Sequence, residues 1–275
     1  MLKFPSSPSA LPPNRLLARI RAGGIDRMYS LGNFASPRHV DYVCATGLFH
    51  SLWLDLEHFD IPTQELAVLN LVARAHPVTT VARFKAADYQ GVMRVLETGV
   101  GGIMCAMVES AAEARRIVSW AKFNNPDPAP GEVTGLRGWN AGGVDARYGT
   151  LPPVDYVRHQ NTEVALICQI ETREAVAELD AIVAEPGVDG VFFGPGDYAH
   201  RIGRLGQIAH PEVIAVLEQV AESCRRHGKF WGTVSAGRDH YRQVQALGAR
   251  LIGVGGDVRV MNYGIRELAK AFADD

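Results

Sequence analysis

The feature that most constrains the fold is an alternation of short apolar runs with longer amphipathic segments. Eight runs are near-continuously hydrophobic, as strands buried on both faces of a parallel sheet are: Met28–Asn33, Ser51–Glu57, Thr79–Arg83, Gly102–Met107, Val164–Ile170, Gly190–Gly194, Phe230–Val234 and Leu251–Val254. Eight such units in 275 residues favour a closed (β/α)8 barrel, the TIM barrel of the α/β class, over an open doubly wound sheet. We therefore predict one barrel domain over residues 1–275, with residues 1–12 as an N-terminal arm.

Helix signals fill the segments between the runs. Asp88 precedes apolar residues at helical spacing and is a natural N-cap. Ser110 is followed three residues later by Glu113, which is the pattern of a capping box, and Thr172 opens another helical segment. We expect an N-terminal helix over Asn14–Ala22 to close the bottom of the barrel. The long Pro- and Gly-rich stretch over residues 123–163 predicts a functional or mobile loop.

Charge and cysteine usage exclude several classes of protein. The net charge is -2 with acidic and basic residues interspersed, so neither nucleic acid nor a membrane surface is an expected partner. The N-terminal segment lacks the long apolar core of a signal peptide. No CxxC pair occurs, and the four cysteines are expected to be free thiols in a reducing cytoplasm: Cys44, Cys105, Cys168 and Cys224.

Polar residues follow several of the predicted strands at their C-terminal ends, where barrel enzymes place their catalytic groups. Such groups are costly beside apolar strands unless they are paired or bind a ligand. The residues concerned are Asp55, Glu57, His58, Arg83, Gln169, Glu171, Thr172 and Asp197. Their convergence on one rim predicts an active site.

The types of these residues suggest a divalent-metal site beside a cationic group. Glu171 and Asp197 offer hard oxygen ligands suited to Mg²⁺ or Mn²⁺, although helix capping by Glu171 and a structural turn at Asp197 remain alternatives. Arg83 could stabilise a carboxylate or an enolate oxygen, or form a salt bridge with Glu57.

A second chemical group of the rim is an imidazole. His58 titrates near neutrality and could transfer a proton, with Asp55 three residues before it fixing the tautomer. A structural histidine is the alternative. A Schiff-base mechanism is not favoured, because only Lys85 and Lys229 lie near strand ends.

The motifs WLDLEH (Trp53–His58), QIET (Gln169–Thr172) and GVFFGPGD (Gly190–Asp197), together with Arg83, resemble the HpcH/HpaI aldolase family. The resemblance extends from about Gly32 to Phe272. It implies a class II pyruvate-dependent aldolase that cleaves or forms 4-hydroxy-2-oxo acids through a pyruvate enolate, so pyruvate and an aldehyde are the expected small-molecule partners.

The resemblance also implies a role for each matching residue. Glu171 and Asp197 would bind the divalent metal, which would be Mg²⁺, Mn²⁺ or Co²⁺. The substrate would be bound by Gln169, by Val234 and by backbone amides around Gly194–Asp197, including that of Gly196. Arg83 would stabilise the enolate. His58, oriented by Asp55, would transfer a proton through a water molecule. Relatives form hexamers, as trimers of dimers with exchanged C-terminal helices, which predicts the same use of Tyr263–Phe272.

The sequence departs from the family pattern mainly on the aldehyde side. Glu97 stands where an aspartate usually reaches the neighbouring subunit's site, Ala106 replaces a proline, and Tyr198 follows the GPGD motif. The sequence therefore does not identify the aldehyde substrate. A CoA-ester lyase of the malyl-CoA or citryl-CoA type, an enolate-trapping synthase that starts from oxaloacetate, and a non-catalytic binding barrel remain as alternative functions.

Overall fold

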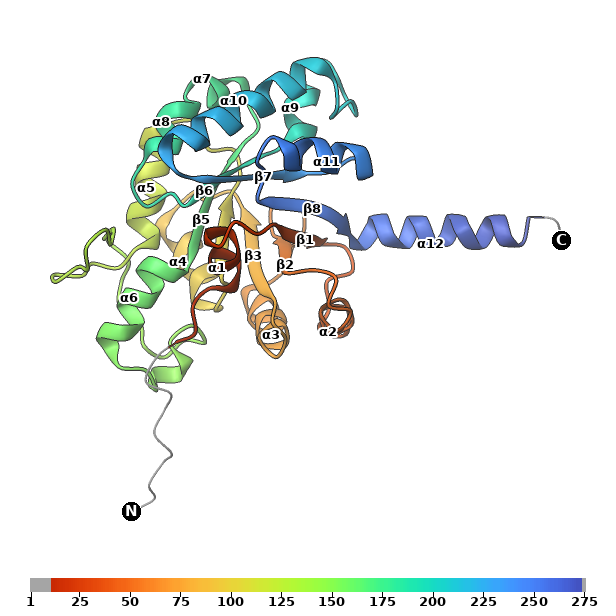
Figure 1. Ribbon diagram of the computed structural model, residues 1–275. Helices are drawn as coiled ribbons and strands as arrows, with labels where there is room; N and C mark the ends of the chain where they lie inside the picture. The colour runs from red at the N-terminus through yellow and green to blue at the C-terminus, as the bar shows by residue number, and fades with distance from the viewer. Residues whose placement is uncertain (1–10, 274–275) are drawn as a thin grey trace.

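The computed structural model describes residues 11–273, and in this part of the chain eight parallel strands form a closed barrel in sequential order (Figure 1). The strands are β1 (Asp26–Leu31), β2 (Ser51–Asp55), β3 (Thr79–Phe84), β4 (Gly102–Cys105), β5 (Ala165–Ile170), β6 (Gly190–Phe193), β7 (Phe230–Val234) and β8 (Leu251–Gly256). Each of the eight predicted runs overlaps one of these strands, with differences of one or two residues at several ends, so the (β/α)8 prediction is confirmed. Most of the predicted N-terminal arm, residues 1–10, lies outside the described residues.

Helices surround the barrel on the outside (Figure 1). They are α1 (Arg15–Arg21), α2 (Pro37–Ala45), α3 (Thr63–Arg74), α4 (Tyr89–Glu97), α5 (Ala111–Ala121), α6 (Pro153–Glu163), α7 (Arg173–Ala177), α8 (Leu179–Ala184), α9 (Pro195–Arg201), α10 (Pro211–His227), α11 (Arg238–Ala246) and α12 (Asp257–Ala271). Asp88, Ser110 and Thr172 cap α4, α5 and α7 as predicted, each accepting a backbone N–H three residues ahead.

The inside of the barrel is a packed core that α1 closes from below. Leu16 and Leu17 of α1 are buried against side chains that point inward from the strands, among them Met28 and Phe192. Asn14 fixes this helix, because its Oδ1 caps the amides of Leu16 and Leu17 while its Nδ2 donates to the Gly101 carbonyl at 2.6 Å. The helix predicted over Asn14–Ala22 therefore has the predicted role.

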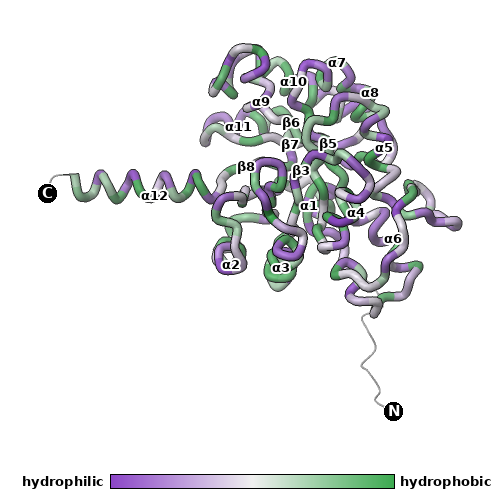
Figure 2. Tube along the Cα trace, turned by 180° about the vertical axis from the view of Figure 1, so that it is seen from behind, coloured by the Kyte–Doolittle hydropathy of each residue, from purple (hydrophilic) through white to green (hydrophobic). Residues whose placement is uncertain are grey.

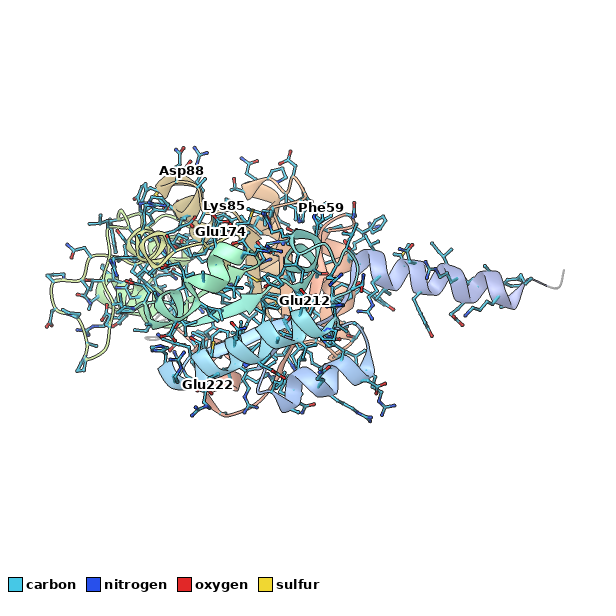
Figure 3. All side chains as sticks on the ribbon, turned by 90° about the horizontal axis from the view of Figure 1, so that it is seen from above. Phe59, Lys85, Asp88, Glu174, Glu212 and Glu222 are labelled. Carbon is cyan, nitrogen blue, oxygen red and sulfur yellow. The ribbon has the colours of Figure 1, made fainter. Side chains whose placement is uncertain are left out.

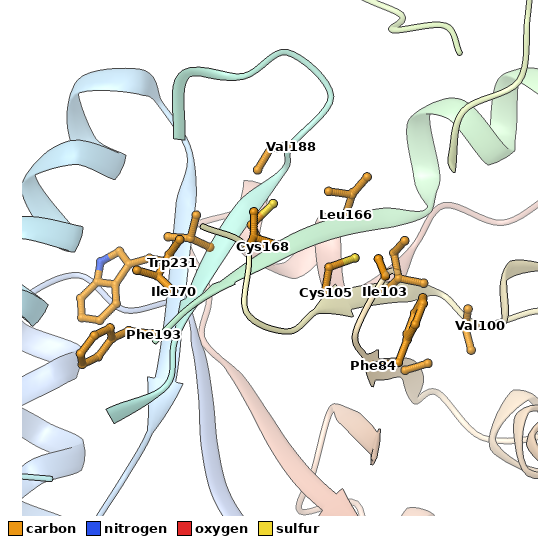
Figure 4. Packing of buried hydrophobic residues seen from close by; sticks show 14 of the residues in the cluster. Phe84, Val100, Ile103, Cys105, Leu166, Cys168, Ile170, Val188, Phe193 and Trp231 are labelled. Atoms are coloured by element: carbon orange, nitrogen blue, oxygen red, sulfur yellow. The ribbon is translucent and has the colours of Figure 1, made fainter. Parts of the chain in front are cut away.

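The outer layer of core lies between the strands and the helices (Figure 4). Phe84, Cys105, Cys168 and Phe193 are all at most 7% exposed in this layer. The alternation of inward and outward residues along fully buried strands explains why the runs are hydrophobic throughout. All four cysteines are buried free thiols, and their expected cytoplasmic environment stays a prediction.

The segment between α5 and α6 is held by a buried ion pair. Arg137 Nη2 donates to Asp145 Oδ2 at 2.7 Å, and both side chains are 1% exposed. The Tyr156 hydroxyl donates to the same oxygen at 2.6 Å, which ties the segment to α6. Much of this long stretch is therefore ordered by interactions that the Pro- and Gly-rich sequence did not reveal.

The C-terminal helix α12 projects away from the barrel (Figure 1), and apolar and polar residues alternate along it (Figure 2). It begins at Asp257, directly after β8, and is thus longer than the segment Tyr263–Phe272 expected from the sequence. Tyr263, Ile265 and Leu268 are about 60% exposed or more. Over the described residues, no helix is long and apolar enough to cross a bilayer.

Candidate active site

The ends of β2 and β3 bring an arginine and a carboxylate together. Asp55 and Arg83 are direct partners in the parallel register of these two strands. Arg83 donates from Nε to Asp55 Oδ1 at 2.9 Å and from Nη2 to Asp55 Oδ2 at 2.5 Å, a bidentate geometry. Both residues are buried, at 5% and 7% exposure, so this pair is shielded from solvent.

Two further contacts fix the Arg83 guanidinium. Its Nη1 lies 2.9 Å from Glu57 Oε2, and its Cζ stands 4.7 Å from the centre of the Trp53 ring. The alternative salt bridge to Glu57 is thus present. A guanidinium has five N–H donors, and the hydrogen bonds to Asp55 engage two of them. The contact with Glu57 is an ion pair without a hydrogen bond, so other N–H groups of Arg83 can serve an oxygen atom of a substrate.

Asp55 was predicted to orient the His58 ring, but in the structure it contacts the backbone of His58 instead. Asp55 Oδ1 accepts the backbone amides of Glu57 at 3.1 Å and His58 at 3.4 Å, and no described contact joins the Asp55 carboxylate to the His58 ring. The reason is the strand register, which presents Arg83 to the carboxylate first. Asp55 therefore fixes the backbone of His58, whose side chain lies exposed at the rim.

Glu171 is a buried carboxylate at the end of β5. It is 1% exposed, its Oε1 accepts the Met107 amide at 2.9 Å, and its Oε2 accepts the side-chain amide of Gln169. Burial, together with the negative charges of Glu57 and Asp197, raises the pKa of Glu171 to about 7. The site thus gathers more negative charge than its neighbours neutralise.

The turn after β6 approaches this carboxylate closely. A Cβ atom at Gly194 would stand 2.5 Å from Glu171 Oε2, so only glycine allows this approach. Pro195 begins α9, and Gly196 and Asp197 lie exposed in its first turn. The predicted residues of the GPGD motif therefore border Glu171.

Sequence reasoning missed Met107, which has a left-handed backbone with φ 52. This conformation costs a non-glycine residue about 1 kcal/mol, and it occurs at the residue whose amide binds Glu171. The sequence carries no glycine or asparagine here to signal it. The two lysines considered for a Schiff base are engaged elsewhere: Lys85 pairs with Glu113 at 2.7 Å, and Lys229 donates to the Val188 carbonyl at 2.6 Å at the opposite end of the barrel.

Val234 ends β7 and is half-buried. It lines a cavity of about 900 Å³ with Trp53 and Ser30, and the cavity continues along α12 as far as Lys270. This cavity opens beside the rim that carries Arg83, since Trp53 contacts both.

The residues of this rim fit a divalent cation. Gln169 Oε1 is buried without a hydrogen-bond partner, and Glu171 has an elevated pKa next to two other acidic groups. A cation would offset this charge, and carboxylate and amide oxygens are suitable donors for Mg²⁺ or Mn²⁺. Within residues 11–273, no group of three or more His, Cys, Asp or Glu side chains is arranged to hold a metal ion.

The chain belongs to the HpcH/HpaI aldolase/citrate lyase family, whose model matches residues 49–262. It is 33% identical to a hydroxypyruvate/pyruvate aldolase of Pseudomonas aeruginosa over 95% of this chain and 94% of that protein. It is 29% identical to a 5-keto-4-deoxy-D-glucarate aldolase of Klebsiella pneumoniae over 96% of this chain and 98% of that protein. The family and these relatives identify the chain as a lyase of the aldolase type.

The solved structures agree with this family. An HpcH/HpaI aldolase/citrate lyase family protein from Burkholderia cenocepacia has a TM-score of 0.84 and is 28% identical, covering 94% of this chain and 98% of its own.

Proposed function

We propose that this protein is a divalent-metal-dependent aldolase that cleaves and forms 4-hydroxy-2-oxo acids through the enolate of pyruvate or a close analogue. The observation that carries the proposal is the acidic cluster around Glu171, whose pKa is raised by burial and by the charges of Glu57 and Asp197, beside the fixed guanidinium of Arg83. The names of the relatives, hydroxypyruvate/pyruvate aldolase among them, support a small 2-oxo acid as the nucleophile.

Glu171 and Asp197 would hold the metal, with Gln169 beside it. A bound Mg²⁺, Mn²⁺ or Co²⁺ would supply a Lewis acid for the carboxylate and keto oxygens of the 2-oxo acid. The residues of the chain would provide the rest of the site. The Gly194–Asp197 turn would contact the substrate carboxylate, and Val234 would border the cavity that receives the aldehyde portion.

Arg83 would stabilise the charge that develops on the enolate oxygen. Its bidentate pairing with Asp55 and its contact with Glu57 fix the guanidinium before the substrate arrives. Preorganised donors of this kind are effective because they need no reorganisation during the reaction. The N–H groups of Arg83 that Asp55 does not engage would donate to the oxygen on which the negative charge accumulates.

His58 would accept the proton of the 4-hydroxyl group through a water molecule. The C3–C4 bond then breaks, the aldehyde leaves, and the electron pair moves onto the enolate; protonation at C3 gives the free 2-oxo acid. Condensation follows the same steps in reverse. Oxaloacetate decarboxylation would produce the same enolate, and we expect it as a side activity.

Pyruvate release provides the test. We would supply 4-hydroxy-2-oxo acids and oxaloacetate to the protein treated with EDTA, and then add Mg²⁺, Mn²⁺ or Co²⁺. We expect EDTA to abolish release and added metal to restore it. If the protein bound no metal and released no pyruvate, the proposal would be abandoned, and cleavage of malyl-CoA and citryl-CoA would be measured next.

We also propose that the protein is a homo-oligomer, a trimer of dimers in which α12 is exchanged. The exposed apolar side chains of α12, which extend into solvent without a neighbouring element (Figure 3), support this. Analytical ultracentrifugation of an Ile265→Arg, Leu268→Arg variant should give a smaller species than the wild type. An unchanged sedimentation coefficient would argue against exchange of this helix.

A further inference from the structure

Three hydrogen bonds donated by backbone amides fasten the turn between β4 and α5 to β3 and to the end of β5. The Ala106 amide donates to the Phe84 carbonyl at 2.9 Å, the Met107 amide to Glu171 Oε1 at 2.9 Å, and the Val108 amide to the Gln169 carbonyl at 3.2 Å. The turn therefore connects the end of β3 with the two residues of β5 that border the proposed metal. A shift of this turn would shift Glu171.

An ion pair at the rim holds the middle of this turn. Lys85, just after β3 and labelled in Figure 3, donates from Nζ to the Met107 carbonyl at 2.6 Å and to Glu113 Oε1 at 2.7 Å. The second oxygen of Glu113 accepts the Glu109 amide at 3.0 Å. The capping-box prediction for Glu113 is corrected here, because its carboxylate serves Lys85 and Glu109 instead of the amide of Ser110.

We infer that Lys85 and Glu113 are positioning residues for Glu171, acting through the left-handed Met107 peptide. This inference rests on the proposed metal-dependent function and names two residues that the function itself does not require. Left-handed backbone is unfavourable for methionine, so something must stabilise it. Lys85 binds the carbonyl that follows the Met107 Cα, and the amide that precedes this Cα donates to Glu171, so the left-handed backbone angles of Met107 link the two contacts.

The Lys85–Glu113 ion pair is expected to act differently from an ordinary surface ion pair. The Lys85 side chain is 42% exposed, and exposed ion pairs by themselves contribute little to stability. The effect is expected on the geometry of Glu171, since groups that orient a metal ligand typically change metal affinity by about 10- to 100-fold. A merely structural ion pair would change the melting temperature and leave metal affinity unaltered.

The test measures Mn²⁺ binding without substrate, by the electron paramagnetic resonance signal of free Mn²⁺. We expect Lys85→Met and Glu113→Gln each to weaken binding by about tenfold. Lys85→Arg, which keeps a cationic donor, should stay closer to the wild type. Arg115→Met is the matched control, because Arg115 also lies on α5 and forms an ion pair with Glu185, at 2.8 Å, away from the turn.

A second variant isolates the backbone conformation from other effects of Lys85. Glycine adopts positive φ without strain, so Lys85→Met should weaken Mn²⁺ binding much less in a Met107→Gly background than in the wild type. Thermal melting of every variant checks folding. If Lys85→Met lowered Mn²⁺ affinity equally in both backgrounds, Lys85 would not act through the backbone conformation of Met107.

The outcomes separate this inference from the proposed function. If the wild type binds Mn²⁺ and Lys85→Met and Glu113→Gln bind it equally well, the positioning role is overturned and the aldolase proposal stands. If Arg115→Met weakens binding as much as Glu113→Gln, the effect is general to α5 and the inference fails. If the wild type binds no Mn²⁺, the metal-dependent function and this inference are both overturned.

Discussion

Two buried carboxyl groups, at opposite ends of the barrel, have raised pKa values but different surroundings. Asp26, at the beginning of β1, is 0% exposed and has a pKa of about 6. Glu171, at the end of β5, is 1% exposed and has a pKa of about 7. Burial is the main cause of the increase in both cases, since an apolar environment disfavours the ionised form.

The neighbours of these two groups act in opposite directions. Ser51 donates to Asp26 at 2.5 Å, and the positive charge of Arg19, 3.9 Å away, also lowers the pKa of Asp26. Around Glu171, the charges of Glu57 and Asp197 raise the pKa further. The charged neighbours at the lower end of the barrel therefore offset part of the burial cost of Asp26, whereas those at the upper rim add to the cost of ionising Glu171, and a cation would neutralise that charge.

The largest effect is expected for Glu171→Gln, which removes the most buried of the acidic groups that meet at the upper rim. Loss of a Lewis acid worth several kcal/mol should lower the rate of pyruvate release by about 10³-fold or more. Without metal, the same variant should be more stable than the wild type at pH 8, by about 3 kcal/mol, because a buried ionised group is removed. Enzyme assays and urea unfolding at pH 8 measure the two effects.

The raised pKa of Glu171 determines whether the stability of the fold rises or falls with pH. The favourable contribution of the protonated form is complete below the unfolded value of about 4.5 and is lost as the pH rises through about 7. The difference in stability between variant and wild type should therefore vanish near pH 4.5. If metal-free Glu171→Gln were less stable than the metal-free wild type at pH 8, the upper rim would not hold an excess of negative charge.

Asp26→Asn tests the lower end of the barrel. Its pKa of about 6 means that the contribution of Asp26 to stability is most favourable below about pH 4 and declines as the pH rises through 6. The variant should lose this decline and gain up to about 3 kcal/mol relative to the wild type between pH 4 and pH 8, measured by urea unfolding. Mn²⁺ binding and pyruvate release should remain within about twofold, since Asp26 lies at the other end of the strands. A large loss of Mn²⁺ affinity would show that the two ends are coupled.

The smallest effect is expected for two glycine substitutions that separate crowding from backbone strain. Gly194→Ala would press against Glu171 Oε2, and we expect Mn²⁺ affinity to fall about tenfold. Gly228 has φ 65 and open space around it, so Gly228→Ala should cost about 1 kcal/mol of stability and leave Mn²⁺ affinity unchanged. Equal effects of both variants on Mn²⁺ binding would mean that the contact at Gly194 has no special role.

Much of the rim could be predicted because barrel geometry is regular. The position of a polar residue just after an apolar run is sufficient to place it at the C-terminal end of a strand. Arg83, Glu171 and Asp197 were found in this way. The partner of Asp55 was predicted wrongly. Its closeness in sequence to His58 suggested that the two side chains interact, but the register of β2 and β3 pairs Asp55 with Arg83.

The sequence by itself determined the eight strands, the helix that closes the barrel and the residues of the rim, because these depend on local hydrophobic patterns and on the capping of single helices. Only the tertiary structure decided which groups meet there. The left-handed peptide of Met107, its support by Lys85 and Glu113, and the close approach of Gly194 to Glu171 all join separate βα units. Such contacts depend on strand register and loop conformation, which no local pattern of residues specifies.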